Sequence, residues 1–328
     1  MGQGLVDSFG RVHRDLRISV TDRCNFRCTY CMPEEGMAWL PRRELLTYEE
    51  IERVARLLVE RYGFESIRIT GGEPTVRAHL PVLIEKLSRL PVDLALTTNG
   101  VSLRLIAHDL AAAGLTRINI SLDSLRAERF AAITRRDSLA EVLEGIDAAL
   151  DAGLAPVKVN VVVMRGVNDD ELVDFAAFGR ARGVTVRFIE YMPLDAAGAW
   201  TNDQVVGREE IVATIGSVFP LEAVGRPDGA PAERFRFADG GGEIGVIPSV
   251  TQPFCGTCDR VRLTAEGQLR NCLFALTELD LRALLRRGAS DDEIGAAIQQ
   301  AVATKWAGHL INQPVFIRPP RSMSQIGG

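Results

Sequence analysis

Three cysteines lie close together near the start of the chain, at Cys24, Cys28 and Cys31, in C-x3-C-x2-C spacing. They follow the apolar run 16–20, which is typical of a buried strand, so the thiols stand in the loop where that strand ends. Thiolates are soft ligands for iron–sulfur clusters, zinc or copper(I), and a structural zinc site needs four ligands where this loop offers three. The spacing favours an iron–sulfur cluster with one iron free to bind another molecule; a zinc knuckle is the alternative.

A second triad follows at Cys255, Cys258 and Cys272, and these two triads account for all six cysteines. No fourth thiolate exists for either triad, so the second one also predicts a cluster with an open iron. C-x2-C pairs in a cytosolic chain indicate metal or redox chemistry more than disulfides. The four histidines are far from both triads in the sequence, and we expect them at the surface or in the core: His13, His79, His108 and His309.

Apolar runs that resemble strands alternate with helical patterns over the first 195 residues, which predicts parallel βαβ units. The runs are 16–20, 66–70, 93–97, 117–121, 157–163 and 185–189. Six units are two short of a closed eight-fold barrel, so we predict an α/β fold, an incomplete (β/α)6 TIM-like barrel, with an open doubly wound sheet as the alternative. Residues 196–328 predict a smaller C-terminal α+β region with two hairpins, the second triad and an irregular tail over 314–328.

The carboxyl ends of the predicted strands carry polar or glycine-rich residues, where parallel strands place their chemistry. The second strand ends in Gly71-Gly72-Glu73-Pro74, the fifth carries Lys158 and Asn160, and the sixth carries Arg187. Glycine lets the backbone approach a ligand closely, and the Glu73 carboxylate can position an ammonium group.

The net charge of −5 predicts no general surface for polyanions such as nucleic acid, so any basic site must be local. Only three of the 38 basic residues are lysines, which makes each lysine more informative than an arginine. No apolar stretch is long enough to span a membrane, and the N-terminus lacks the apolar segment of a signal peptide, so we expect a cytoplasmic protein with no membrane partner.

The cysteine loop and the Gly-Gly-Glu-Pro turn resemble the radical S-adenosylmethionine (SAM) superfamily. With the second triad, nearly the whole chain resembles the GTP 3′,8-cyclase family, which starts molybdenum cofactor biosynthesis. Further matching motifs are Arg14-Asp15-Leu16-Arg17, Arg68, Thr97, Lys158, Met192, Cys-x2-Cys-Asp-Arg-Val-Arg at 255–262, and Gly327-Gly328. The chain departs from the family after the double glycine, where it has Thr75 and then Arg77-Ala78-His79.

The resemblance implies two [4Fe-4S] clusters, one on each triad. It implies that the first cluster binds SAM and that the second binds the guanine base of GTP. SAM contacts carried over from the family are Tyr30, Gly72, Glu73, Ser121 and Met192. GTP contacts carried over in the same way are Arg17, Arg68, Thr97, Lys158, Arg260, Val261 and Arg262. Catalytic roles fall by resemblance on Arg17, Arg260, Arg262, Arg321, Gly327 and Gly328. The tail would enter the substrate pocket with Arg321; a frayed end is the alternative.

The implied reaction is radical cyclisation of GTP to (8S)-3′,8-cyclo-7,8-dihydroguanosine 5′-triphosphate, in which a SAM-derived radical takes the ribose 3′ hydrogen. The implied partners are an electron donor such as flavodoxin or ferredoxin, the next pathway enzyme (cyclic pyranopterin monophosphate synthase) and a second copy in a homodimer. Two alternative functions are a peptide-modifying radical SAM enzyme and an iron- or redox-sensing binding protein. The first would bring more cysteines and a peptide-binding module, and the second would not need the double glycine.

Overall fold

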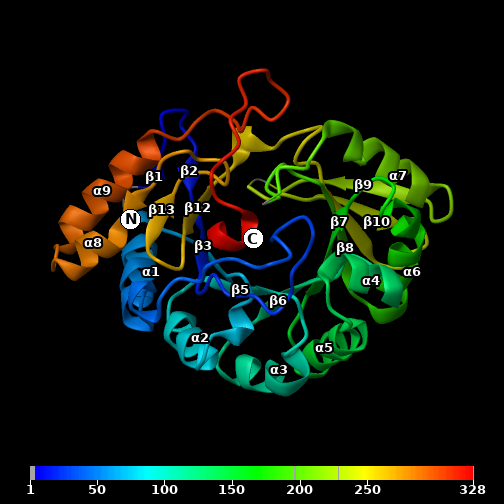
Figure 1. The fold of residues 1–328 in the computed structure, drawn as a ribbon, viewed down its shortest axis with the longest axis horizontal. Coiled ribbons are helices and arrows are strands. Elements are labelled where there is room, and N and C mark those ends of the chain that lie inside the picture. The colour runs from blue at the N-terminus through cyan, green and yellow to red at the C-terminus, as the bar shows by residue number, and fades with distance from the viewer. Residues whose placement is uncertain (1–3, 196, 228, 328) are drawn as a thin grey trace.

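Six parallel strands, paired in the order of the sequence, curve into part of a barrel at the centre of the molecule (Figure 1). The computed structural model describes residues 4–195, 197–227 and 229–327. The six strands are β3 (Asp15–Ser19), β4 (Ser66–Thr70), β5 (Asp93–Thr98), β6 (Arg117–Ser121), β7 (Val157–Val163) and β8 (Thr185–Glu190). This order has no reversal of the kind that defines a doubly wound sheet, so the predicted incomplete barrel is confirmed.

Helices cover the outer face of these strands (Figure 1). They are α1 (Tyr48–Tyr62), α2 (Leu80–Ser88), α3 (Leu103–Ala112), α4 (Ala127–Thr134), α5 (Leu139–Asp151) and α6 (Leu172–Arg182). The expected capping box starts α1, because the Thr47 and Glu50 side chains each accept the other residue's backbone N–H. Gly63 ends this helix in the left-handed region, at φ 71°. The short helix α4 was not expected from the sequence.

The two predicted C-terminal hairpins form, but each also joins an edge of the barrel sheet. The strand β11 (Glu243–Ile247) pairs in parallel with β8, and β12 (Arg260–Leu263) pairs in parallel with β3. The remaining strands of the sheet are β9 (Leu221–Gly225), β10 (Glu233–Phe237), β13 (Gln268–Arg270) and β14 (Leu279–Asp280). Within the described residues the sheet has twelve strands and stays open, with β14 at one edge and β9 at the other.

One hydrophobic core runs through both halves of the chain, since Val246 and Val261 belong to the same buried cluster as Leu16. The strands β1 (Leu5–Val6) and β2 (Val12–His13) form a separate hairpin outside the large sheet. The C-terminal helices are α7 (Arg208–Gly216), α8 (Leu281–Arg286) and α9 (Asp291–Ala303). The division at residues 195 and 196 stays a prediction.

The end of the C-terminal tail, residues 322–327 of the described chain, returns to the middle of the barrel (Figure 1). The prediction of an irregular tail over 314–328 is wrong near its end, where residues form the short helix α10 (Met323–Ile326). A capping box between Ser322 and Gln325 starts this helix, and Ser324 and Ile326 are buried. The tail is thus packed inside the fold as far as Gly327, and Gly328 lies outside the described residues. No helix within the described ranges is long and apolar enough to span a membrane.

Candidate active site

A first cavity opens at the carboxyl ends of the barrel strands, and all three thiols of the first triad line it. The turn after Cys28 is tight, because the backbone N–H groups of Cys31 and Met32 both donate to the Cys28 carbonyl at 2.9 Å. Other residues that line this cavity include Tyr30, Gly71, Gly72, Glu73, Asn99, Ser121, Asp123, Asn160, Met192 and Ser324. The structure therefore brings all five predicted SAM contacts to one place.

Backbone hydrogen bonds join the Gly-Gly-Glu turn to the start of the cysteine loop. The Gly72 N–H donates to the Thr21 carbonyl, and the Glu73 N–H donates to the Arg23 carbonyl, each at 2.7 Å. A Cβ atom on Gly72 would lie 2.5 Å from the carbonyl oxygens of both Asp22 and Arg23. Only glycine permits this approach of two backbones, so Gly72 sets the distance between the cysteine loop and β4.

Glu73 is buried, and most of its acceptor capacity is already used by neighbours. Its Oε1 accepts from the Thr75 N–H, the Thr75 hydroxyl and the Thr98 hydroxyl, and its Oε2 accepts from the Asn99 N–H at 2.7 Å. Burial raises the pKa of this carboxyl group, while these hydrogen bonds lower it. Oε2 keeps one lone pair for an ammonium donor, so Glu73 can both hold the strand ends together and orient a ligand.

Tyr30 reaches across the first cavity to Asp123, a residue that the sequence did not single out as a site residue. The Tyr30 hydroxyl donates to Asp123 Oδ2 at 2.6 Å, and Asp123 Oδ1 accepts from the Val162 N–H at 2.8 Å. Burial raises the pKa of Asp123 to about 6. This contact ties the aromatic residue of the cysteine loop to the ends of β6 and β7.

The thiols of the first triad are held in their protonated form when no metal is bound. Burial raises the pKa of Cys24 to about 12 and that of Cys31 to about 11, and it raises the pKa of Cys28 as well. Metal binding to thiols releases their protons, so assembly of a cluster here would be coupled to deprotonation. Three free thiols facing one cavity fit an iron–sulfur cluster.

A second cavity lies beside the first, and the second triad lines it. Its other lining residues include Arg17, Arg68, Thr97, Asn160, Arg187, Phe254, Arg260, Arg262, Phe274 and His309. The second triad is electrostatically unlike the first. Burial alone would raise the pKa of the Cys258 thiol, but the nearby Arg260 and Lys305 cations lower it below its usual value.

Arginines crowd the barrel wall of the second cavity. Arg17 and Arg68 lie side by side on β3 and β4, and Arg262 pairs with Arg17 from β12. Burial and neighbouring cations lower the pKa of Arg187 to about 9, and the same causes lower that of Arg262 to about 10. The buried Nε atoms of Arg17, Arg68 and Arg260 have no hydrogen-bond partner in the described part of the chain. Cations that repel one another around a cavity, with donors to spare, fit a polyanionic ligand.

Four predicted GTP or catalytic residues in the described part of the chain line neither cavity: Lys158, Val261, Arg321 and Gly327. Lys158 shares the inward face of β7 with Asn160 but does not line the second cavity. The Val261 side chain is fully buried in the core, so it faces away from the barrel interior and leaves only its backbone available. Arg321 forms ion pairs with Glu266 and Glu278 instead of reaching the pocket.

The two cavities meet along one wall, where five residues line both: Thr97, Asn160, Ile189, Met192 and Met323. Met323 belongs to the tail, so the tail separates the two triads and touches both cavities. The tail is held there because Arg262 Nη1 donates to the Gly327 carbonyl at 2.8 Å. A ligand in either cavity would therefore contact residues that also face the other.

Sequence reasoning missed three residues that the fold brings to the second triad. His309 lies in the cavity wall, where its ring packs against Phe274 at 5.2 Å between centroids. Its Nε2 bonds to the Ser249 carbonyl at 2.8 Å, and its Nδ1 accepts from the Ile311 N–H, so neither nitrogen is free to be a ligand. Lys305 contacts Cys258, and His13 contacts Lys305. The rarity of lysine was the one signal that pointed to Lys305.

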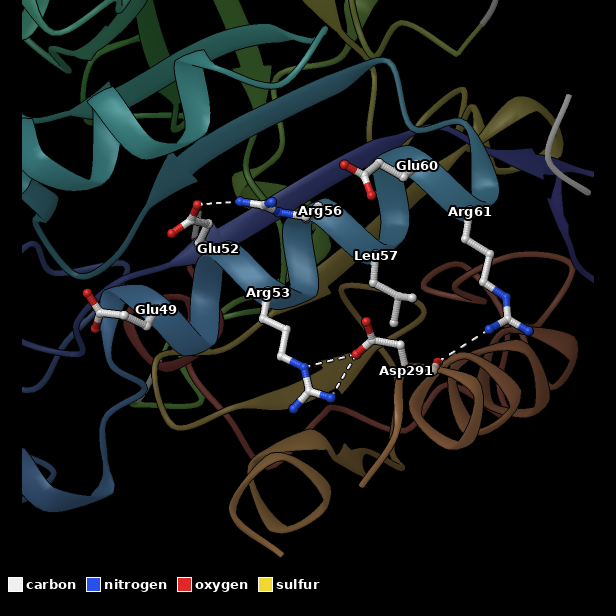
Figure 2. A pocket seen from close by; sticks show the side chains of 8 residues that line it. All are labelled: Glu49, Glu52, Arg53, Arg56, Leu57, Glu60, Arg61 and Asp291. Atoms are coloured by element: carbon white, nitrogen blue, oxygen red, sulfur yellow. Dashed lines mark hydrogen bonds and ion pairs between the residues drawn. The ribbon is translucent and has the colours of Figure 1, made fainter. Parts of the chain in front are cut away.

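A groove on the outer surface lies far from both triads, between α1 and the start of α9 (Figure 2). Charged side chains of α1 line it, and Arg53 pairs with Asp291 at 2.7 Å across it. Exposed ion pairs of this kind contribute about 0–1 kcal/mol and are screened by salt. We assign this groove to the packing of α9 on α1 and not to chemistry.

The zinc alternative is not supported by the arrangement of the described side chains. No three His, Cys, Asp or Glu side chains among residues 4–195, 197–227 and 229–327 converge closely enough to hold a single metal ion. A structural zinc site needs four ligands around one ion.

Two family models cover most of the chain. Residues 18–179 match the Radical SAM superfamily, and residues 184–311 match Molybdenum Cofactor Synthesis C. The chain is 49% identical to the GTP 3′,8-cyclase of Streptomyces coelicolor, over 99% of this chain and 96% of that protein. It is 50% identical to the GTP 3′,8-cyclase of Mycolicibacterium smegmatis, over 99% of this chain and 92% of that protein.

Solved structures share the fold at low sequence identity. SuiB of Streptococcus suis bound to S-adenosylmethionine matches with a TM-score of 0.63 at 13% identity, over 93% of this chain and 76% of that chain. Methylornithine synthase matches with a TM-score of 0.53 at 16% identity, over 88% of this chain and 86% of that chain. At these identities the likeness is one of fold alone.

Proposed function

The chain belongs to the GTP 3′,8-cyclase family of radical SAM enzymes, and from this premise we propose that its two cavities divide the reaction between them. It is an enzyme of the first step of molybdenum cofactor biosynthesis, the conversion of GTP to (8S)-3′,8-cyclo-7,8-dihydroguanosine 5′-triphosphate. The family uses a [4Fe-4S] cluster and SAM. A peptide-modifying or purely sensing role has no comparable support.

The first cavity is proposed to hold the SAM-binding cluster on Cys24, Cys28 and Cys31. When bound, the cluster and SAM together supply the radical chemistry of the reaction. Gly72 holds β4 close to the cysteine loop, and the free lone pair of Glu73 Oε2 would accept from the ligand's ammonium group. The remaining proposed SAM contacts are Tyr30, Ser121 and Met192.

The second cavity is proposed to hold GTP beside a second [4Fe-4S] cluster. The arginines on β3, β4 and β12 would bind the triphosphate, since guanidinium groups with unpaired donors match phosphate oxygens. The proposed GTP contacts are Arg17, Arg68, Thr97, Lys158, Arg260, Val261 and Arg262. The second triad would place its cluster at the guanine base, as the resemblance implies.

One observation carries this proposal: the two cysteine-lined cavities share a wall, and the tail contributes Met323 to that wall. A hydrogen on a ligand in the second cavity would thus face a radical source in the first, and the buried tail would help to keep water from the space between them. Exclusion of water protects a reactive intermediate from side reactions.

Anaerobic incubation of reconstituted protein with SAM, dithionite and GTP tests the function directly. We expect 5′-deoxyadenosine and the cyclised nucleotide to form together. When GTP is omitted, no cyclised nucleotide can form, and less 5′-deoxyadenosine should accumulate. Formation of 5′-deoxyadenosine with GTP present but no cyclised nucleotide would contradict the proposal. Inosine triphosphate is a matched substrate control, because it lacks only the exocyclic amine of the base.

Lys158 gives this proposal a pH dependence. Burial and the nearby Arg187 cation lower the pKa of Lys158 to about 8, so its ammonium group is charged below that pH and neutral above it. If Lys158 contacts the triphosphate, GTP affinity falls as the pH rises through about 8, and bound phosphate shifts that midpoint upward. Lys158→Arg should flatten this profile because arginine stays charged.

The proposed contact of Lys158 with the triphosphate also predicts how loss of the Lys158 charge changes GTP binding. Lys158→Ala should weaken GTP binding about ten- to a hundredfold near neutral pH, measured by equilibrium dialysis, because one charge-assisted hydrogen bond contributes about 1.5–3 kcal/mol. Equal GTP binding by this variant would remove Lys158 from the site. Lys86→Ala is the matched control, since Lys86 pairs with Glu52 on the outer helices.

The partners remain proposals of the same kind. An electron donor such as flavodoxin or ferredoxin would reduce the clusters, and cyclic pyranopterin monophosphate synthase would take the product. A homodimer and a cytoplasmic location stay predictions.

A further inference from the structure

Lys305 is a buried cation in direct contact with the second triad. Its Nζ donates to the carbonyl oxygens of Cys258 and Arg260 at 3.1 and 3.0 Å, and it lies 3.5 Å from Cys258 Sγ. The residue is 3% exposed and follows the C-terminus of α9, where the helix dipole favours a cation. Within the described ranges it is the one cationic side chain that donates to a cysteine sulfur.

A buried chain of contacts stands behind Lys305. His13 Nδ1 lies 3.5 Å from Lys305 Nζ, and His13 Nε2 lies 3.2 Å from Asp7 Oδ2. Burial and the Lys305 cation lower the pKa of His13 to about 4, so its ring is neutral near neutral pH. In that state Nδ1 accepts from Lys305 and the Nε2 proton goes to Asp7.

The same aspartate braces the other end of the triad. Arg11 Nε donates to Asp7 Oδ2 at 2.6 Å, and Arg11 Nη1 donates to the Cys255 carbonyl at 2.7 Å. Arg11 Nη2 donates to the Trp306 carbonyl, next to Lys305 in the chain. The N-terminal hairpin of β1 and β2 thus fixes Lys305 and the backbone of two cysteines together.

We propose that Lys305 is a positioning residue that raises the reduction potential of the iron–sulfur cluster on the second triad, and that Asp7 and His13 hold it in place. This inference rests on the proposed second cluster. A one-electron reduction adds a negative charge to the cluster, which a buried ammonium and an N–H···S hydrogen bond stabilise. Loss of Lys305 therefore lowers the potential.

The first triad supplies an internal comparison. The Phe26 backbone N–H approaches Cys24 Sγ at 3.4 Å, and no cationic side chain of the described residues donates to a sulfur there. The Lys305 contact therefore acts on one cluster only, and its loss leaves the first cluster unchanged.

The test measures a potential and does not depend on turnover. In a chain with Cys24, Cys28 and Cys31 replaced by alanine, the second cluster is reconstituted alone and titrated with dithionite under EPR detection. Lys305→Met should lower the ratio of reduced to oxidised cluster at least about tenfold at a fixed potential, which is about 59 mV for one electron. Lys305→Arg keeps the charge, so its potential should stay close to that of the chain with Lys305. Lys86→Met removes an equal charge from a distant helix and should cause no shift.

A second variant separates charge from damage to the fold. Lys305→Gln, which keeps a donor, replaces Lys305→Met if the latter does not fold. An unchanged potential in the Lys305 variant that folds overturns this inference. If the background chain with Lys305 intact takes up no iron, the proposed second cluster fails instead.

Discussion

Replacing Cys24, Cys28 and Cys31 by alanine is expected to abolish reductive cleavage of SAM. These residues are the cysteines that line the first cavity, where all five proposed SAM contacts also lie. Without a thiolate-bound cluster, no electron reaches the sulfonium of SAM. Formation of 5′-deoxyadenosine should fall below detection with or without GTP, while the iron of the proposed second cluster, about four per chain, should remain.

The matched experiment replaces Cys255, Cys258 and Cys272 by alanine. This variant should keep one cluster and some cleavage of SAM but make no cyclised nucleotide, because the second cavity holds GTP in our proposal. The pair of variants thus separates the two triads by product. About four irons per chain in the fully reconstituted, unsubstituted protein would contradict the presence of two clusters.

Local patterns in the sequence predicted most of the barrel. The six strand-like runs correspond to β3 through β8, and the capping box at Thr47 starts α1 as expected. These features depend on residues a few positions apart. The parallel pairing of β11 with β8 and of β12 with β3 joins segments far apart in the sequence, so no local periodicity could predict it. Those pairings bring the second triad to the barrel mouth.

For the candidate site, too, the sequence predicted features set by neighbouring residues and missed contacts between residues far apart in the chain. Spacing identified both triads, and resemblance identified the arginines on β3, β4 and β12 that the fold gathers around one cavity. Lys305 and Cys258 are 47 positions apart, and His13 and Lys305 are 292 apart, so their contacts exist only in the folded chain. Arg321 pairs with Glu266 and Glu278 in the folded chain, and nothing in its sequence neighbourhood revealed these partners.

Substitution of Gly327 by alanine is expected to lower GTP turnover roughly a hundredfold while leaving both proposed clusters and SAM binding unchanged. Gly327 has φ 88°, and a Cβ atom there would lie 2.6 Å from Thr70 Oγ1 and 2.8 Å from Ser19 Cβ. The left-handed region costs an alanine about 1–2 kcal/mol before any clash. Displacement of the tail would also break the bond from Arg262, which contributes about 1.5–3 kcal/mol.

The free energy of tail docking that Gly327→Ala removes is thus enough to lower GTP turnover about a hundredfold. Gly240→Ala is the matched control, because Gly240 has φ 81° but no atom within 4 Å of an added Cβ. It should affect stability alone and leave turnover per folded molecule intact.

Deleting Gly327 and Gly328 tests the same contact without adding a side chain. Arg262 then loses its tail acceptor, and the wall between the two cavities opens to water beside Met323. We expect turnover to fall steeply and SAM to be cleaved without cyclisation, since an unprotected radical is quenched by side reactions. A synthetic peptide of residues 322–328 should restore part of the activity. If the truncated enzyme converts GTP at the rate of the full-length enzyme, the end of the tail only packs against Arg262 and takes no part in catalysis.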